Sequence, residues 1–589
     1  MVKSFCGKIW NFSAPDKAKV DEVKSIVRGN LLAKILVNRG FSGADEANNF
    51  LNAKLRNTIP DPSLLLDMDK AVGRVIEAIY KKQNIMILGD YDVDGVTSTA
   101  LMIKYLRLIG INPEYYIPNR FSDGYGVSQN AVSKALEKQA NLVIAVDAGT
   151  NSNVEIDIAK QQGIEFVILD HHTQVSAELP KAVAVVNPSR NDQNEIGFSH
   201  IKNLCAAGVV FLFLIALQRK LKENGFFTDK EVPNLLNFAD IVTLGTLCDV
   251  MELRGMNRAI VKYTLAHDQY SLGIRSLMSA FNIEKISSPE DLAFFIGPAI
   301  NAAGRVDDPQ VALNLLLEEV PERSQKIAAC LIEFNKKRKS VENKLLADAM
   351  DMIAEQNLAT KRGICVYGEG WNEGVIGIVA GKLKDKFQKP TFVISFGDNG
   401  VGKGSARSVS GIHLGQFLQK SNSAGITVGG GGHALAGGFS IQKDKIRDFC
   451  QFIEEQIEGE FINALDIDYT LTAMSDLDAI YEEISPLEPF GKGVEKPVFC
   501  FKRIRVSNIR RSNSGGHLFL DFSGEFGNGS IRAAIFHINS KKEFVDQINK
   551  NADALLDIAG TISYSAQYDS SIIIEDARIS QKETGTCAS

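Results

Sequence analysis

Three aspartates alternate along one short segment and have the spacing of a cation site. Asp90, Asp92 and Asp94 lie in GDYDVDG, after an apolar run typical of a strand and before a helical stretch. Closely spaced carboxylates repel one another unless a cation lies among them, and their hard oxygen atoms suit Mg²⁺ or Mn²⁺. Because ligands of open α/β sheets bind at the carboxyl ends of strands, this segment predicts a divalent-cation site at such an end.

Further acidic and imidazole side chains follow the next strand-like runs. Asp147 lies in VIAVDAGT, Asp170, His171 and His172 lie in VILDHHT, and Asp249 in LGTLCDV is a further candidate. A cluster of this kind can hold two divalent ions about 4 Å apart and activate a water for phosphoryl transfer. The sequence has no GxSxG elbow, and this chemistry needs no serine or cysteine nucleophile.

Other interpretations of these residues stay open. The pattern DxDxDG also begins the calcium loop of an EF-hand, and Gly95 fits that loop, but the preceding strand and the lack of a glutamate at the twelfth loop position do not. A single strand-end aspartate, Asp147 or Asp249, can be a helix N-cap, and a lone buried histidine is more often a core residue than a ligand. The joint placement of these residues favours the metal site.

The elements that must position these side chains alternate between strand and helix. β-Branched runs at 84–90, 141–149 and 164–170 are separated by helical stretches at 98–110 and 155–163. Strands separated by helices of this length imply right-handed βαβ crossovers and a parallel sheet that is covered on both faces. The acidic residues then lie together at one edge of that sheet.

The pattern of periodicity changes along the rest of the chain. Short helical patterns come first, a long stretch broken only by Pro321 follows the parallel-sheet region, and period-two strands dominate the end. We predict an α/β chain with a helical lead-in (1–64), a parallel-sheet domain (65–308), a helical connector (309–358), a smaller α/β domain (359–460) and an OB-type β-barrel (461–582).

Composition limits the class of protein. Hydrophobic residues make up 45% and charged residues 23% of the 589 residues, which is typical of a soluble globular protein, and no apolar run approaches the roughly 18 residues of a membrane span. The N-terminus shows no signal-type core, so we expect a cytoplasmic protein without membrane contact. Eight scattered cysteines form no CxxC pair and predict no zinc site. A net charge of −6 means that any nucleic-acid site must be a local basic groove.

The motifs GDYDVDG, VDAG, LDHH and LGTLCDV, in that order, resemble motifs I to IV of the DHH phosphoesterase superfamily. GPAINAAGR, WNEGVIGIVAGKL, GKGSARS and GGGGHALAGGF resemble the segments that lead into and form the second domain of these enzymes, the DHHA1 domain. PNRFSDGYGV, PLEPFGKGVEKPVF and LLAKILVNRGF narrow the resemblance to the RecJ exonuclease family, from about residue 50 nearly to the C-terminus. The resemblance implies a single-stranded-DNA-specific 5′-to-3′ exonuclease that acts in DNA repair and recombination.

The same resemblance implies a role for individual residues. The implied metal ligands of two Mn²⁺ or Mg²⁺ ions are Asp90, Asp92, Asp94, Asp147, His171 and Asp249. His172 is implied as a ligand or an orienting neighbour, and Asp170 as a partner that supports the ligands. Arg120, Ser405 and Arg407 are the candidates for binding a terminal 5′ phosphate, since the arginine fork matches phosphate oxygens. Arg305 and His433 are expected to face the cleft between the two domains, and the GGGGH segment to let DNA or a phosphate approach the backbone.

The C-terminal segment KRIRVSNIRR fits a DNA-binding role. We expect its basic residues to lie near Phe499, Phe501 and Phe519, because OB folds bind single strands by positive charge and base stacking. These basic residues are Lys502, Arg503, Arg505, Arg510 and Arg511. A plain solvated strand face is the alternative.

Three positions depart from the family pattern, and two other functions compete. Leu88 and Asn372 stand where histidine is frequent in relatives, and Ala299 where arginine is frequent. A DHH hydrolase of small substrates is disfavoured by the extra C-terminal unit, and an inactive scaffold by the retention of every motif aspartate. The resemblance further implies a monomer whose partners are single-stranded DNA, a single-strand-binding protein and a helicase.

Overall fold

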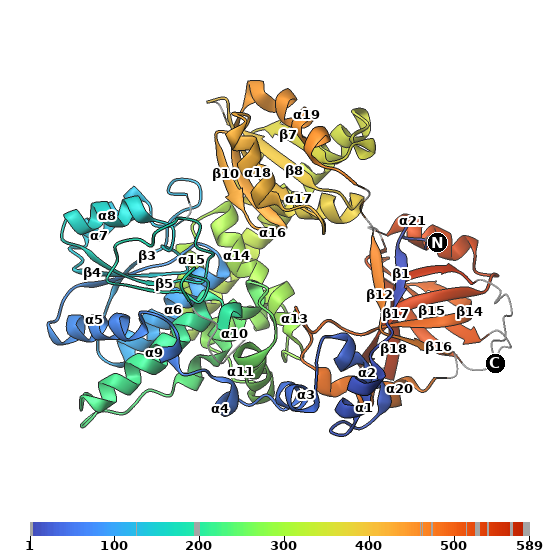
Figure 1. Ribbon diagram of the computed structural model, residues 1–589, viewed down its shortest axis with the longest axis horizontal. Helices are drawn as coiled ribbons and strands as arrows, with labels where there is room; N and C mark the ends of the chain where they lie inside the picture. Colours follow the sequence, from blue (N-terminus) through green and yellow to red (C-terminus); the bar gives the residue numbers. More distant parts are fainter. Residues whose placement is uncertain are drawn as a thin grey trace. The chain divides into compact units, whose positions relative to one another are not determined.

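The computed structural model describes residues 4–124, 126–193, 201–397, 399–459, 461, 463–472, 475–513, 515–524, 530–538, 541–565 and 569–580. The chain forms two compact units, each of which is described by itself. One comprises Lys54–Phe461, and the other combines Met1–Ala53 with Ile462–Ser589 (Figure 1). The predicted segment boundaries at residues 1, 460 and 582 lie outside the described residues.

A five-stranded parallel sheet in the order β3-β2-β4-β5-β6 forms the first half of the larger unit. Its strands are β2 (Ile85–Leu88), β3 (Glu114–Tyr116), β4 (Leu142–Val146), β5 (Glu165–Leu169) and β6 (Ala184–Val186). The predicted runs for β2, β4 and β5 are confirmed as central strands, and they are apolar almost throughout because both faces of the sheet are covered. The two outer strands, three residues each, were not predicted.

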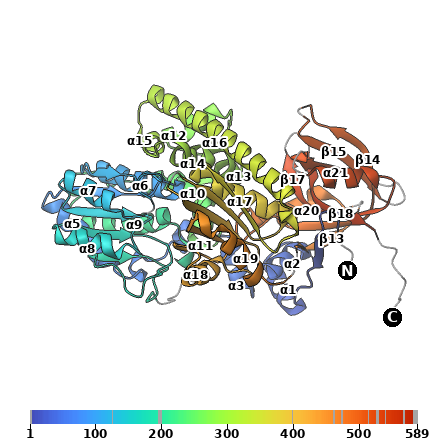
Figure 2. The same cartoon turned by 90° about the horizontal axis from the view of Figure 1, so that it is seen from above.

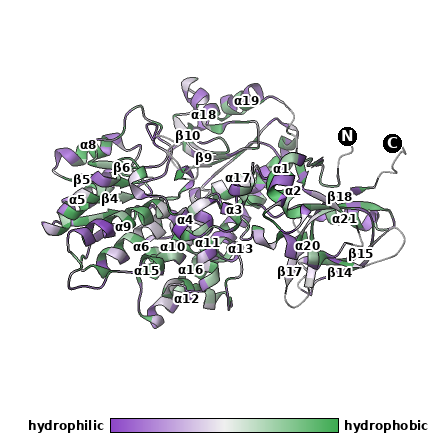
Figure 3. Cartoon of the chain, turned by 60° about the horizontal axis from the view of Figure 1, so that its bottom comes forward, coloured by the Kyte–Doolittle hydropathy of each residue, from purple (hydrophilic) through white to green (hydrophobic). Residues whose placement is uncertain are grey.

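Helices cover both faces of this sheet. On one face, Met86, Leu88 and Ala145 pack against residues of α7 and α8 such as Val132 and Ile156. On the other face, α5, α6 and α9 contact the strands and one another. Figure 3 shows apolar residues along β4 and β5 and mixed faces on the surrounding helices. These helices are α5 (Met68–Tyr80), α6 (Val93–Leu108), α7 (Gln129–Glu137), α8 (Asn153–Gln161) and α9 (Ala206–Glu223).

A helical region follows the sheet. It comprises α10 (Ala239–Cys248), α11 (Gly255–His267), α12 (Leu272–Ala280), α13 (Pro289–Asp291), α14 (Gly297–Val306), α15 (Gln310–Leu317) and α16 (Pro321–Glu355), while the short α4 (Leu55–Thr58) precedes the sheet. Figure 2 shows α16 beside α12 and α14, which it contacts. Pro321 begins α16 rather than interrupting a helix, since the fixed φ of proline suits the first helical position. The segment boundaries within this unit, near residues 65, 308 and 358, stay predictions.

The second half of the larger unit is a smaller α/β layer. Its sheet has the order β10-β11-β9-β8-β7, with β7 and β8 parallel and the other neighbours antiparallel. Helices α16 and α17 pack on one face, and α18 and α19 on the other. The elements are β7 (Ile364–Glu369), α17 (Glu373–Phe387), β8 (Thr391–Phe396), β9 (Val401–Arg407), α18 (Leu414–Ser423), β10 (Gly429–Gly432), β11 (Ala436–Gln442) and α19 (Ile446–Gln456).

The smaller unit contains a closed barrel. Strand β14 pairs with β15 on one side and with β17 on the other, and β16 and β18 are parallel neighbours, so that β14-β15-β16-β18-β17 closes on itself with the topology of an OB fold. This confirms the predicted OB-type barrel. The elements are β12 (Ala464–Ile467), β13 (Tyr469–Leu471), α20 (Leu477–Ile484), β14 (Val498–Arg511), β15 (His517–Gly524), β16 (Ile531–Phe536), α21 (Lys542–Lys550), β17 (Leu556–Ser565) and β18 (Asp569–Ile579).

The part of the predicted helical lead-in (1–64) up to Ala53 belongs to this barrel unit and is largely helical, while the predicted boundary at residue 64 stays a prediction. Strand β1 (Ile9–Phe12) pairs in parallel with β12, and the Trp10 indole N–H donates to Asp576 Oδ2 at 2.9 Å. Helices α1 (Lys17–Lys24), α2 (Asn30–Asn38) and α3 (Ala44–Leu51) follow. Because β1 and β12 are so distant in the chain, their pairing leaves no local signal in the sequence. No helix in the described part of the chain combines the length and apolar character that a membrane crossing requires.

Candidate functional site

The strand ends of the parallel sheet carry the predicted acidic residues. Asp147 and Asp170 directly follow β4 and β5, and Asp90 lies two residues beyond β2. Because these three strands are neighbours in parallel register, their side chains meet at one edge. Asp92 is the N-cap of α6 and accepts a hydrogen bond from the Gly95 N–H at 3.0 Å. The loop joins a strand to a helix, which overturns the EF-hand interpretation.

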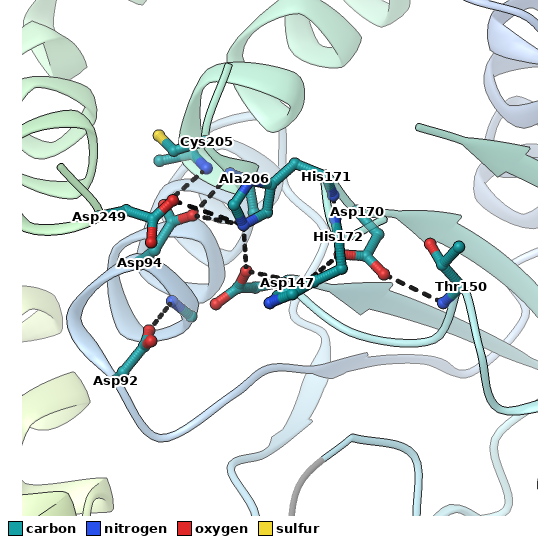
Figure 4. Close-up of polar contacts among 12 residues, drawn as sticks. Asp92, Asp94, Asp147, Thr150, Asp170, His171, His172, Cys205, Ala206 and Asp249 are labelled. Atoms are coloured by element: carbon teal, nitrogen blue, oxygen red, sulfur yellow. Dashed lines mark hydrogen bonds and ion pairs between the residues drawn. The ribbon is translucent and has the colours of Figure 1, made fainter. Parts of the chain in front are cut away.

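His171 lies at the centre of the acidic cluster (Figure 4). Its Nε2 is 3.3 Å from Asp147 Oδ1, 3.6 Å from Asp249 Oδ2 and 3.7 Å from Asp94 Oδ2. Burial lowers the pKa of His171 in spite of the carboxylates around it. The imidazole is therefore neutral near pH 7, which is the form that binds a metal ion.

Helix ends position two of these carboxylates. Asp94 accepts hydrogen bonds from the N–H groups of Ala206 and Ala207, at 2.6 and 3.0 Å, at the N-terminus of α9, where the helix dipole favours negative charge. Asp249 follows the last residue of α10, so it lies at a helix C-terminus and is neither a strand end nor an N-cap. The N-cap of α8 is Ser152, so the N-cap alternative is wrong for Asp147 as well.

Asp170 supports the cluster from behind. Its carboxylate accepts hydrogen bonds from the Thr150 N–H at 3.0 Å and the His171 N–H at 2.7 Å, and it lies 2.8 Å from His172 Nδ1 (Figure 4). Burial opposes charge on both partners, but their mutual attraction outweighs it. The pKa of Asp170 is held well below its usual range, and that of His172 is raised to about 9. Asp170 thus holds the backbone of His171 and the ring of His172 in place.

The donor set fits divalent ions. Three groups of ligand atoms each lie within 4.8 Å of one another, namely Asp90, Asp92 and Asp147; Asp94, His171 and Asp249; and Asp147, His171 and His172. Burial and mutual repulsion raise the pKa values of Asp90 and Asp147, and the buried Asp90 Oδ1 has no hydrogen-bond partner among the described residues. Carboxylate and imidazole donors in this number suit Mn²⁺ or Mg²⁺. Which residues ligate which ion stays a prediction.

Arginines from separate elements lie close to the acidic cluster. Burial lowers the pKa of Arg305 to about 10, with smaller contributions in the same direction from Arg120, Arg338 and Arg407 and an opposing one from Asp92. The planar guanidinium fork suits recognition of an anion such as phosphate. The structure thus places Arg120 and Arg407, the two arginines predicted to bind a terminal 5′ phosphate, within electrostatic range of Arg305, which was predicted to face the cleft, and these roles stay predictions. Arg338 of α16, which was not among the predicted residues, forms an ion pair with Glu342 at 2.7 Å.

Helix α17 connects Arg305 with the predicted Ser405–Arg407 pair. Arg305 Nη1 donates to the Gly374 carbonyl at 2.7 Å, and Arg407 Nη1 donates to Ser405 Oγ at 3.3 Å. A Cβ atom at Gly377 would lie 3.0 Å from Ser405 Oγ and 3.2 Å from Arg407 Nη2, so this glycine permits the close approach. Gly374, which Arg305 contacts, and Gly377, which Ser405 and Arg407 approach, are only about one turn apart in α17.

The departures from the family pattern have structural explanations, and His433 lies in a turn. Leu88 packs in the apolar core with Met86 and Ala145. Asn372 is the N-cap of α17 and accepts from the Gly374 N–H at 2.8 Å, and Ala299 is buried in α14. The predicted His433 is exposed between β10 and β11, and its position facing a cleft stays a prediction.

In the barrel, the expectation of stacking by three phenylalanines was only partly met. Phe499 and Phe501 are completely buried in the core and cannot stack on bases, whereas Phe519 is 41% exposed and is the cross-strand neighbour of Arg510. Two register shifts in β14, after Phe501 and after Ser507, change which side chains face outward. The side chains of Lys502, Arg505, Arg510 and Arg511 are exposed, and that of Arg503 is partly exposed.

Comparisons with known proteins agree with these features. Family models match the DHH family, N-terminal domain (residues 84–246), the DHHA1 domain (358–459) and the RecJ OB domain (467–569). The single-stranded-DNA-specific exonuclease RecJ of Haemophilus influenzae is 31% identical over 536 residues, which cover 88% of this chain and 91% of that protein. The protein of the same name from Escherichia coli is 32% identical over 440 residues, which cover 72% and 74% of the two chains.

Solved structures show the same architecture. The crystal structure of RecJ from Thermus thermophilus in complex with Mn²⁺ superposes with a TM-score of 0.79 at 26% identity, covering 98% of this chain and 81% of that chain. A crystal structure of an exonuclease RecJ bound to manganese has a TM-score of 0.56 at 29% identity and covers 67% of this chain and 94% of its own. Sequence identity, domain content and fold together show that this chain belongs to the RecJ family.

Proposed function

We propose that this chain is a metal-dependent exonuclease that hydrolyses single-stranded DNA from its 5′ end and releases 5′-mononucleotides. The observation that carries the proposal is the carboxylate–imidazole cluster around His171 at the strand ends. Support comes from the family, because the relatives from Haemophilus influenzae and Escherichia coli are named single-stranded-DNA-specific exonucleases. We assign Asp90, Asp92, Asp94, Asp147, His171 and Asp249 as the metal ligands.

The chain's own residues prepare the site for phosphodiester hydrolysis. Bound Mn²⁺ or Mg²⁺ would lower the pKa of a water and neutralise charge on the scissile phosphate. Asp147 and His171 each belong to two of the three ligand groups. The Asp147 carboxylate, with two oxygen atoms, could serve two ions, whereas the single ring nitrogen that His171 turns toward the cluster could serve only one. Asp170 holds the backbone of His171 and the ring of His172, and the α9 N-terminus fixes Asp94. Such fixed supports hold ligands in productive geometry.

We assign recognition of the 5′ end to the arginine group. Arg305 lies within electrostatic range of Asp92, Arg120 and Arg407, and Ser405 adds a hydroxyl beside Arg407. A terminal 5′ phosphate held by their planar forks would leave the next phosphodiester as the one that reaches the metal ligands. This arrangement explains release of one nucleotide at a time from a phosphorylated 5′ end.

We assign binding of the remaining strand to the OB barrel, and the cellular context follows the same proposal. Phe519 offers an exposed ring for stacking, and exposed basic residues of β14 offer charge. We propose a cytoplasmic monomer that acts in DNA repair and recombination, with a single-strand-binding protein and a helicase as partners. Two DHH alternatives compete with this proposal, a hydrolase of small substrates and an inactive scaffold.

Digestion of labelled strands tests the proposal. A 5′-labelled single strand, a 3′-labelled strand of the same sequence and a blunt duplex are incubated with Mn²⁺ or Mg²⁺. We expect immediate release of labelled mononucleotide from the first, gradual shortening of the second and an intact duplex. Asp147→Ala should be inactive, whereas Asp157→Ala, which removes an exposed carboxylate of α8, should retain activity. No cleavage of any strand with either metal would favour one of the alternatives.

A further inference from the structure

Tyr91 lies between two assigned metal ligands and is in contact with an arginine. Its ring is nearly buried, and the guanidinium carbon of Arg120 lies 4.1 Å from the ring centroid. A cation within about 6 Å of an aromatic centroid is attracted to the ring face. Tyr91 therefore connects the chain segment of the metal ligands to a side chain of the arginine group.

Both carboxylates and guanidinium groups influence the Tyr91 hydroxyl, as expected for a ring that lies between the metal ligands and the arginine group. Burial raises the pKa of Tyr91, Asp90 and Asp92 add to the effect, and Arg120 and Arg305 oppose it. Helix α14 packs closely against the backbone of Tyr91, since a Cβ atom at Gly304 would lie only 2.6 Å from the Tyr91 carbonyl oxygen. The ring is thus held at a set place between carboxylates and arginines.

Arg120 depends on this ring for its orientation. No carboxylate in the described part of the chain forms an ion pair with Arg120, and its buried Nε has no hydrogen-bond partner there. Its loop is fixed at the backbone, because Asp123 accepts hydrogen bonds from the Asn119 N–H and the Tyr116 hydroxyl, both at 2.7 Å. Stacking on a ring face occupies the plane of a guanidinium group and leaves its in-plane N–H donors available for phosphate oxygens.

We propose that Tyr91 is a positioning residue for Arg120: its ring holds the guanidinium group in the orientation that binds the terminal 5′ phosphate of the substrate. This inference rests on the proposed function, in which Arg120 binds that phosphate. A purely structural role of Tyr91 would affect all substrates alike. A positioning role affects only substrates that carry the 5′ phosphate, and only while Arg120 is present.

Steady-state kinetics on matched 5′-phosphorylated and 5′-hydroxyl single strands separates these roles. We expect Tyr91→Leu to raise KM for the phosphorylated strand about 3- to 10-fold, because the variant loses a partly buried cation–π contact. For the hydroxyl strand, both kcat and KM should change less than about twofold. Tyr91→Phe keeps the ring and should restore the wild-type KM. Tyr105→Leu, which removes a fully buried ring of α6, is the matched control and should leave the preference for phosphate unchanged.

A double-mutant cycle and metal titration complete the test. In an Arg120→Ala background, Tyr91→Leu should change KM for the phosphorylated strand less than about twofold, and Mn²⁺ affinity by calorimetry should match wild type. The inference would be overturned if Tyr91→Leu changed KM equally for both strands, or changed it as much without Arg120 as with it. It would also be overturned if Tyr91→Phe failed to restore KM or if Tyr91→Leu weakened Mn²⁺ binding. If Arg120→Ala itself leaves the preference for phosphate intact, the phosphate role in the proposed function fails instead.

Discussion

Replacing Asp147 by asparagine should stabilise the metal-free protein while abolishing its response to metal. The carboxylate is buried, and its pKa is raised by burial and by repulsion from Asp94, Asp92 and Asp90. Asparagine has the same shape, and it tolerates the left-handed conformation of this position (φ 60°) well. The substitution therefore removes a buried charge with little change in packing.

The size of the effect follows from the geometry. Oxygen atoms of Asp147, Asp90 and Asp92 lie within 4.8 Å of one another, which at an effective dielectric constant of about 20 gives roughly 3.5 kcal/mol for each fully charged pair. Partial protonation and attraction by His172, 3.8 Å away, reduce the net relief to about 2 kcal/mol. A unit of about 400 residues unfolds with about 0.85 kcal/mol/K of entropy, so Tm should rise by about 2 °C.

Differential scanning fluorimetry with EDTA or Mn²⁺ measures both parts of this prediction. Mn²⁺ at about 100 times its Kd should stabilise wild type by about 2.7 kcal/mol, or about 3 °C, and leave Asp147→Asn unchanged. Because the folded-state pKa of Asp147 is raised above 3.8, wild type loses stability as pH rises from 3.8 through that raised pKa. The advantage of the variant in EDTA should therefore grow over this pH range and then stay constant.

Asp157→Asn, at an exposed position of α8, is the matched control and should change neither measurement. A lower Tm of Asp147→Asn in EDTA at pH 8, or an equal Mn²⁺ response in variant and wild type, would refute the reasoning that a cation offsets repulsion at this site.

Three further predictions concern the cap of α2, the barrel surface and phosphate binding. Glu483 accepts hydrogen bonds from the N–H groups of Leu31 and Leu32 at 2.7 and 3.1 Å, so Glu483→Ala should lower the free energy of unfolding by about 1 kcal/mol. Urea unfolding followed by Trp10 fluorescence in a Trp371→Phe background measures this loss. Replacement of the exposed Glu482 by alanine is the control, and an equal loss in both variants would contradict a capping role. Phe519→Ala should weaken binding of single-stranded DNA several-fold in anisotropy titrations and leave Tm unchanged, because this ring is exposed. Phe501→Ala removes a buried ring and should lower the free energy of unfolding by about 3–5 kcal/mol. Unchanged DNA affinity of Phe519→Ala would show that Phe519 is not part of the DNA-binding surface. Arg407→Lys keeps the positive charge but loses the planar guanidinium fork that donates two parallel hydrogen bonds. KM for 5′-phosphorylated strands should therefore rise about tenfold, with little change for 5′-hydroxyl strands. Equal increases of KM for both kinds of strand would argue against phosphate binding by Arg407.

Local order in the sequence was enough to predict the centre of the site. Strands β2, β4 and β5 are short apolar runs, and the aspartates that follow them are part of the same segments, so each motif carried both its element and its ligand candidate. Parallel pairing then required these ends to meet, which placed Asp90, Asp147, Asp170 and the histidines together. The closed barrel was also predictable, because its strands keep a period of two over most of their length.

Only the tertiary structure decided the features that depend on distant segments. Asp249 reaches His171 from a helix end, which no local pattern in the sequence encodes. The contact of Arg305 with the Gly374 carbonyl likewise joins segments that are far apart in the chain. Phe499 and Phe501 lie in the part of β14 that is buried on both faces, whereas Phe519 is on the outward face of β15. Strand β1 joined the barrel unit by pairing with β12 across most of the chain. These features depend on which distant segments pack against one another. That choice is determined by the burial of apolar surface in the whole fold, and the sequence next to any one residue does not contain it.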